Sequence, residues 1–289
     1  MVYLMMGILP AVAMRDVQIL QLVGQLAICD RDLQSVSDIV QHNLAGENID
    51  FPGWSGIARR TAAIYNLMDP LELFNDPWES HRWSKYAKKE VISYWTKLLI
   101  ENAETYPSLD LLDLDSLSLT SPHRIWTAAG KNPFSVRKAT IVSWLLLNVY
   151  KTGERLFTMK KVKSPQCVLC LSPLDNRLHF ALQCTELIQI RSEYFEKFTQ
   201  SCPNIKKYIE DKQLLLIILL DPFSSKVPTE VKESWCNQDT AYTLTRNYFY
   251  DIHKKREKMI ESINISDQNT ELDIEDATKI IITLYETNS

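Results

Sequence analysis

Three cysteines and one histidine stand close together near the middle of the chain, and their spacing suits a metal site. Cys167, Cys170, His179 and Cys184 follow the pattern Cys-x2-Cys-x8-His-x4-Cys. Three thiolates and one imidazole are the ligand set of a closed, four-coordinate structural zinc site. The first pair fits a tight turn, and the second pair fits a helix start, where residues about one turn apart face the same way. The alternative is four unrelated residues, two of them buried thiols.

A closed site of this kind predicts a structural zinc ion and argues against catalysis. Four protein ligands leave no position for a reactive water, so a zinc enzyme is the least favoured class, and a zinc with three protein ligands would revive it. The sequence holds no Asp-Asp pair, Gly-x-Ser-x-Gly, Walker lysine loop or His-Glu-x-x-His. The carboxylates of Asp110, Asp113 and Asp115 alternate with leucines, and we expect them to face solvent. We therefore expect the chain not to be an enzyme, and its other histidines to be structural or exposed, namely His42, His81, His123 and His253.

A basic segment directly precedes the cysteine cluster. Residues 131–163 contain eight lysines or arginines against the single acid Glu154. Phosphate neutralisation by such side chains supplies most nonspecific nucleic-acid affinity. A solvated helix face is the alternative interpretation. The nucleic-acid-binding candidates are Arg137, Lys138, Lys151, Arg155, Lys160, Lys161 and Lys163.

Aromatic residues are interleaved with these cations, and the end of the chain has the opposite charge. Phe157 and Tyr150 could stack on bases, whereas we expect Trp144 to lie in the core. Residues 264–289 hold six acids against Lys279. We expect this tail to be weakly ordered. Because the whole chain carries a net charge of −4, it is not an obvious polyanion binder as a whole, and the basic segment must act locally.

Composition and cysteine usage bound the protein class. The chain has 289 residues with 45% hydrophobic and 24% charged residues, an ordinary globular composition. Its six cysteines, three of them in the cluster, suit a reducing compartment with a metal site better than a disulfide framework. The apolar first residues lack a basic segment, and Pro10 interrupts them, so we do not interpret them as a secretion signal. No apolar run reaches membrane-spanning length. We therefore expect an intracellular protein, nuclear or cytoplasmic, without a membrane partner.

Helical periodicity dominates the sequence and alternating strand patterns are scarce. The predicted fold is mainly α, a helical bundle followed by a small CCHC zinc knuckle embedded between helices. The expected helices cover residues 13–28, 35–44 with Ser35 as N-cap, 57–68, 77–100, 136–150, 186–198, 205–220 and 241–263. Residues 48–55 read as a loop, and residues 109–119 as either a short helix or a packed loop. The expected domains are a helical region at 1–120, a basic helix with the zinc knuckle at 121–200, C-terminal helices at 201–263 and the acidic tail at 264–289.

Several of these blocks together resemble the C-terminal region of non-LTR (LINE-like) retrotransposon reverse transcriptases. The basic helix at 136–150 leads into Ser-Pro-x-Cys-x-x-Cys at 164–170, similar to the entry of that family's zinc-binding region. The run Asp-Asn-x-x-His-Phe-x-x-x-Cys at 175–184, followed by Arg191, resembles the family's Glu-Thr-x-x-His-x-x-x-x-Cys run; here Asp and Asn replace Glu and Thr. Residues 214–222 and 246–256 are similar to looser segments that follow it. Residues 9–24 are similar to the stretch just past the polymerase core, so the resemblance spans residues 9–260.

The resemblance implies a nucleic-acid-binding module that helps to hold template RNA or target DNA during target-primed reverse transcription. The family's polymerase motif, an aromatic-Ala-Asp-Asp turn, is missing from this sequence, so the implied module binds without synthesising. RNA or DNA, or both, are the expected partners. The second hypothesis is a zinc-stapled helical protein that binds another protein, either domesticated or a relic reading frame. In that case the aromatic residues between Trp78 and Trp95 and the acidic tail would matter more.

Overall fold

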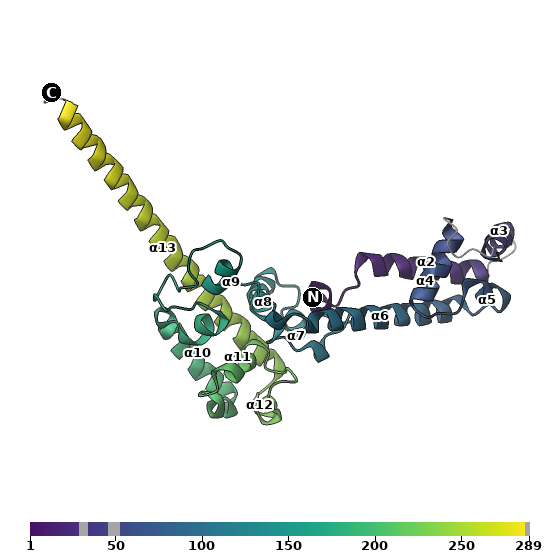
Figure 1. Cartoon of the computed structure of the whole chain (residues 1–289). Helices are drawn as coiled ribbons and strands as arrows, with labels where there is room; N and C mark the ends of the chain where they lie inside the picture. The colour runs from purple at the N-terminus through teal and green to yellow at the C-terminus, as the bar shows by residue number, and fades with distance from the viewer. Residues whose placement is uncertain (29–33, 46–52, 287–289) are drawn as a thin grey trace. The chain divides into compact units, whose positions relative to one another are not determined.

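The computed structural model describes residues 1–28, 34–45 and 53–286, with the backbone alone beyond Ile263. Within these ranges the chain forms helices and turns, and the sole extended pairing is an isolated bridge between Ser118 and Ser121. The fold is therefore mainly α, as the periodicity predicted (Figure 1). No helix in the described part of the chain combines the length and apolar character needed to cross a membrane.

The contacts divide the chain into two compact units. Unit 1 comprises Met1–Pro107 and Leu114–His123, and unit 2 comprises Ser108–Asp113 and Arg124–Ser289. The domain boundary predicted after residue 120 lies close to the end of unit 1 at His123. The divisions predicted at residues 200 and 263 both fall inside unit 2 and stay predictions.

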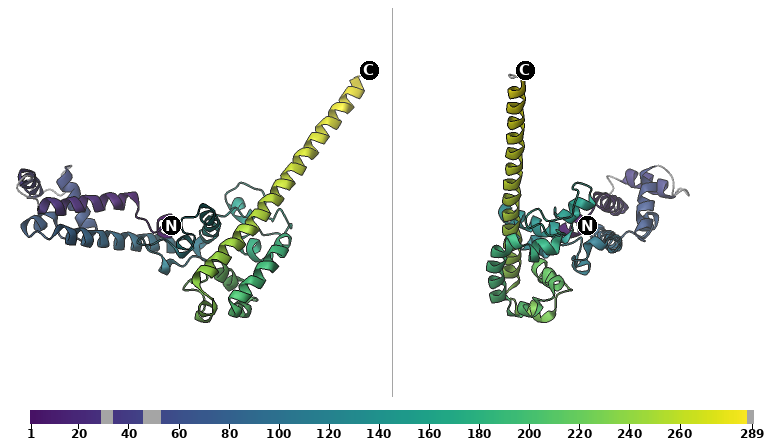
Figure 2. Two further views of the ribbon diagram at one scale, coloured as in Figure 1. Left: turned by 180° about the vertical axis from the view of Figure 1, so that it is seen from behind. Right: turned by 60° about the vertical axis from the view of Figure 1, so that its left-hand side comes forward.

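In the described part of unit 1, α2 lies along α6 in all views (Figures 1 and 2). Trp83 of α6 is fully buried, and its indole N–H donates to the Leu20 carbonyl at 2.7 Å. Gly24 permits this close approach, because a Cβ there would lie 2.3 Å from the Trp83 ring. The helices are α1 (Val2–Met6), α2 (Ala11–Ala27), α3 (Gln34–Ala45), α4 (Trp54–Ile64), α5 (Pro70–Asn75) and α6 (Ser80–Glu104).

Local capping explains where unit 1 differs from the sequence expectations. Helix α3 begins at Gln34, so Ser35 lies within its first turn and is not the N-cap. Helix α4 ends at Ile64 rather than at Met68, and Asp69 begins α5: its carboxylate accepts the Leu71 N–H at 2.9 Å, with Pro70 at the first helical position. Most of the predicted 48–55 loop lies outside the described residues.

The leucine-rich stretch at 109–119 is a packed loop with two short 3-10 turns, Pro107–Leu109 and Leu114–Ser116. The expectation that all three of its aspartates face solvent is wrong for Asp113, which is 2% exposed. Its carboxylate accepts the N–H of Ser225 at 2.5 Å and the Ser225 hydroxyl at 2.8 Å. Hydrogen bonds of this kind compensate the cost of burying a carboxylate, so Asp113 anchors the loop within unit 2.

Unit 2 packs its helices around α13, which lies beside α8 and α10 (Figure 2). The predicted helix at 205–220 is split, because Asp211 accepts the Leu214 N–H and starts a new helix. Helix α13 is assigned through Glu286, where we expected a weakly ordered tail; residues 238–289 contain no proline or glycine to end it. The helices are α7 (Arg124–Thr127), α8 (Pro133–Leu146), α9 (Gly153–Thr158), α10 (Ile188–Ser201), α11 (Lys212–Leu220), α12 (Thr229–Ser234) and α13 (Gln238–Glu286), with the 3-10 helix η6 (Pro203–Tyr208).

Candidate metal centre

The first two candidate ligands lie on one tight turn. The Cys167 N–H donates to the Ser172 carbonyl, and the Leu171 N–H returns to the Cys167 carbonyl, both at 2.9 Å. The pKa of Cys167 is lowered, first because the Cys184 thiol donates a hydrogen bond to its sulfur, and further because the backbone N–H groups of Cys170 and Leu169 point at it. The Cys184 thiol and the backbone of the turn therefore both favour a thiolate at Cys167, the form that binds metals.

The second pair lies on a π-helical turn, η4 (His179–Gln183), which ends at Cys184. The Asn176 side chain accepts the His179 N–H at 2.8 Å and so begins the turn. At its end the Cys184 N–H donates to the His179 carbonyl at 2.8 Å, a bond that spans five residues. In an α-helix a five-residue step rotates a side chain by about 140°. The wider π turn instead brings Cys184 round to the side of His179.

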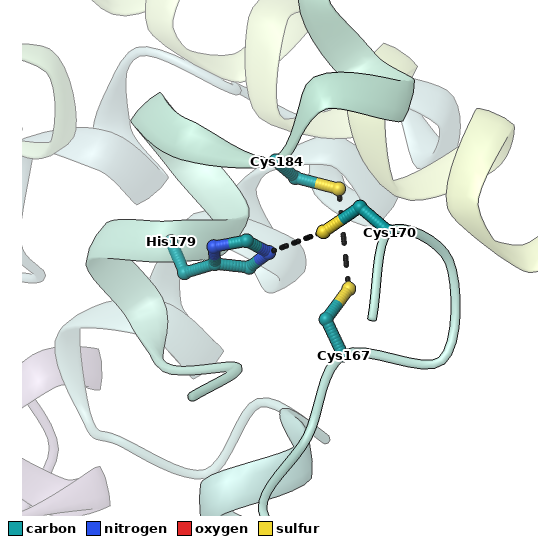
Figure 3. A group of neighbouring side chains, drawn as sticks. All are labelled: Cys167, Cys170, His179 and Cys184. Atoms are coloured by element: carbon teal, nitrogen blue, oxygen red, sulfur yellow. Dashed lines mark hydrogen bonds between the residues drawn. The ribbon is translucent and has the colours of Figure 1, made fainter. Parts of the chain in front are cut away.

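The four side chains converge on one centre (Figure 3). Their ligand atoms all lie within 4.8 Å of one another, with Cys167 Sγ to Cys184 Sγ at 3.9 Å and Cys170 Sγ to His179 Nε2 at 3.3 Å. A tetrahedral ion with ordinary zinc–ligand bonds would place two sulfurs about 3.8 Å apart and a sulfur and nitrogen about 3.6 Å apart. The donor atoms therefore fit a metal ion, and the two sulfurs are too far apart for a disulfide.

Burial closes this site. Cys167, His179 and Cys184 are buried, and Cys170 is half-buried. Three thiols and an imidazole gathered in a buried pocket form a donor set that a metal ion satisfies directly. The segment is not a clear zinc knuckle, however, because its second half is helical rather than a compact loop.

Arg191 and Tyr248 hold the π turn from outside. The Arg191 guanidinium donates to the Cys184 carbonyl at 2.8 Å and to the Ala181 carbonyl at 3.2 Å. The Tyr248 hydroxyl donates to the same Ala181 carbonyl. Carbonyls freed by a π turn need such donors. Arg191, which the sequence places shortly after the cluster, therefore stabilises this turn.

The predicted cationic residues divide into five exposed and two half-buried side chains. Lys138 is half-buried: its ammonium donates to the Asn247 side chain at 2.7 Å and lies over the Phe134 ring. Arg155 is also half-buried, and neither residue is as free to reach a phosphate as the others. Five candidates are exposed in unit 2, namely Arg137, Lys151, Lys160, Lys161 and Lys163.

The end of α9 presents these cations together with apolar side chains. Lys160 adopts φ 56° at the helix end, where its N–H donates to the Phe157 carbonyl and the Lys161 N–H reaches the Leu156 carbonyl. Glycine is the usual residue in this left-handed position, so the turn keeps a lysine there against its backbone preference. Phe157 and Met159 are each 47% exposed, and apolar and cationic side chains therefore share this surface.

Two aromatic residues lie elsewhere than the sequence suggested. The expectation that Trp144 lies in the core is wrong, since it is 42% exposed. Its neighbours Ile141 and Leu145 take the buried face of α8 instead. Tyr150 is buried, and its ring lies 4.6 Å from the ring of Phe180, which follows the candidate ligand His179.

Sequence reasoning used Asp175 and Arg256 only as parts of a resemblance, yet both are buried beside the cluster. No local signal in the sequence marks this pair, because aspartate is an ordinary loop residue and arginine an ordinary helix residue.

No protein-family model matches this chain, and neither a curated protein nor a solved structure does.

Proposed function

We propose that this chain is a zinc-stabilised module that binds RNA or DNA without catalysis, through cationic side chains beside the metal centre. The observation that carries the proposal is the closed Cys3His cluster, which is joined to a basic segment, residues 151–163, whose single acid is Glu154. A metal held by four protein ligands stabilises its surroundings and activates no water. The module would be a piece or descendant of a retroelement reverse transcriptase, a proposal supported by the resemblance of residues 136–191.

Zinc is the metal that the donor set supports best. Thiolates together with an imidazole in tetrahedral spacing select zinc over magnesium or calcium, which prefer oxygen ligands. A zinc ion with three thiolates carries a net charge of −1, and the four positions would be fully used. Its contribution would be to fix the turn at Cys167 against the π turn at His179.

The surface next to the cluster suits a polyanion. Residues 155–174 contain four lysines or arginines and no aspartate or glutamate. Exposed lysines at 160, 161 and 163 can neutralise phosphates, and the exposed Phe157 ring can stack on a base. This combination favours a nucleic acid over an uncharged partner.

Close backbone packing ties this surface to the metal turn. A Cβ at Gly153, the first residue of α9, would lie 2.8 Å from the carbonyl oxygens of both Pro165 and Gln166. Helix α9 therefore rests directly on the stretch of backbone that leads into Cys167. Losing the metal should displace α9 and scatter its cations.

The decisive experiment compares nucleic-acid affinity with and without the metal at two salt concentrations. Metal content per chain is measured first, and fluorescence anisotropy then follows binding of a labelled single-stranded RNA, a single-stranded DNA and a duplex. We expect chelation, or Cys167→Ser, to abolish binding, and added salt to weaken it by orders of magnitude in the intact protein. Full affinity in a metal-stripped sample would break the link between the metal and the surface.

A matched pair of variants locates the nucleic-acid contact. Lys160→Gln with Lys161→Gln should weaken binding and reduce the salt slope by roughly 0.7 to 0.9 for each phosphate that is no longer neutralised. Lys85→Gln with Lys89→Gln removes two exposed lysines of α6 in unit 1 and should leave the slope unchanged. Absent binding, or a flat salt slope, would favour the protein-interaction hypothesis. Trp83 cannot be one of the aromatic contacts in that hypothesis, because it is fully buried.

A further inference from the structure

A buried ion pair connects the loop between the metal ligands to the long helix α13. Asp175 is 0% exposed and Arg256 is 3% exposed. The guanidinium of Arg256 donates to both carboxylate oxygens of Asp175, at 2.5 Å and 3.1 Å. Such bidentate pairing fixes orientation as well as distance.

Asp175 is also the point where three segments around the cluster meet. Its carboxylate accepts the Gly153 N–H at 2.7 Å, at the start of α9. Its backbone N–H donates to the Pro165 carbonyl at 2.8 Å, and its carbonyl accepts the Glu154 N–H at 3.0 Å. The segment before Cys167 and the segment before His179 are therefore tied together at this one residue.

Arg256 also lies beside the segment that carries His179. Its guanidinium carbon lies 5.5 Å from the centre of the Phe180 ring, and Phe180 directly follows His179. A cation at this position favours the net negative charge of an ion bound by three thiolates.

We propose that Arg256, acting through Asp175, is a positioning residue of the metal centre, so that metal binding and the docking of α13 reinforce each other. This inference rests on the proposed metal site and adds α13 to it. Thermodynamic linkage requires the effect to be reciprocal: whatever α13 contributes to metal affinity, the metal returns to the stability of α13 at this point. Partners of metal-site loops typically tune affinity in this way.

The test measures metal affinity in the full chain, by competition with a chelator of known zinc affinity. Arg256→Gln and Asp175→Asn should each weaken zinc binding by about tenfold. The double variant should bind no more weakly than the worse single variant, because both act through one contact. Cobalt spectra of the variants should still show tetrahedral thiolate coordination, since all four ligands remain.

Tyr242→Phe provides a matched control on the same helix. The Tyr242 hydroxyl donates to the buried Asp221 carboxylate at 2.8 Å, so this variant also removes a buried, charged hydrogen bond of α13. Its partner belongs to the end of α11 rather than to the ligand loop. We expect Tyr242→Phe to lower stability while leaving zinc affinity unchanged.

Hydrogen exchange supplies the reciprocal readout. Zinc should slow amide exchange in the part of α13 around Arg256 in the wild type and in Tyr242→Phe, but not in Arg256→Gln. Should Arg256→Gln fail to fold, Arg256→Lys decides, because it keeps the charge and loses the bidentate geometry; it should bind zinc with intermediate affinity. A wild type that binds no zinc overturns the metal site itself. If the wild type binds zinc and neither Arg256→Lys nor Asp175→Asn changes the zinc affinity, this inference is overturned and the metal site is not.

Discussion

Unit 1 buries a tryptophan where α2 meets α6, whereas unit 2 gathers four candidate metal ligands and an ion pair in its interior. In unit 1 Trp83 lies in a cluster of buried apolar side chains and makes one indole hydrogen bond to a backbone carbonyl, while the buried carboxylate of Asp16 accepts the Tyr65 hydroxyl at 2.7 Å. In unit 2 thiols, an imidazole, a carboxylate and a guanidinium are gathered in the interior. Burying such groups costs free energy unless each finds its partner.

The two units should therefore respond to different chemical changes. Apolar packing is insensitive to chelators and weakly sensitive to pH, and it responds to changes of side-chain volume. A metal cluster responds to chelators, to pH and to oxidation of its thiols. A change made in one unit can consequently use the other unit as an internal control.

Metal removal should produce the largest effect. Without the ion, the Cys167 turn and η4 lose their common centre, so unit 2 should lose several kcal/mol of stability. Hydrogen exchange measured by peptide should show faster exchange in residues 150–200 after chelation, and unchanged exchange in α2 and α6. Cys184→Ser should reproduce the pattern without a chelator. Equal loss of protection in both units would mean that the centre does not act locally.

The next largest effect is expected from Trp83→Ala in unit 1. Removing a fully buried tryptophan leaves a cavity and should cost about 3 to 5 kcal/mol. Thermal unfolding should then show unit 1 melting earlier. Metal content and the metal dependence of unit 2 should stay as in the wild type, and a variant that also lost its metal would contradict the separation of the two units.

A smaller effect is expected where α2 meets the same tryptophan. Gly24→Ala places a methyl group 2.3 Å from the Trp83 ring, and the overpacking should cost about 1 to 3 kcal/mol. The double variant with Trp83→Leu should recover part of the loss, because the smaller side chain removes the clash. Denaturant titration of the four proteins gives the coupling energy directly. Additive losses would show that Gly24 matters for another reason.

The sequence predicted the helices and the candidate ligands better than it predicted the long-range contacts. Helix existence and the four ligand candidates followed from periodicity and spacing, both local signals. Long-range partners did not follow, because nothing local indicates that Ser225 satisfies Asp113 or that Arg256 meets Asp175 across 81 positions. The π turn lies between these two cases. The five-residue step from His179 to Cys184 is visible in the sequence, but an α-helix was the simpler expectation.

The smallest expected effect concerns His253 on α13, next to the metal-centre residues. Burial lowers the pKa of His253 below its ordinary value of 6.5; Glu257 opposes this shift, and Arg137 and Arg256 add to it. The Tyr150 hydroxyl and His253 Nδ1 share a hydrogen bond at 3.0 Å. The stability that His253 contributes is therefore fully present above the ordinary value and is lost as the pH falls from there through the lowered pKa.

His253→Gln isolates this contribution from acid release of the metal. Wild type and variant share the same four ligands, so protonation of those ligands affects both equally. The difference in unfolding free energy between them should narrow from pH 7.5 to pH 5.5, because only the wild type loses the neutral histidine. Parallel stability curves over this range would show that His253 titrates as freely in the folded chain as in the unfolded one.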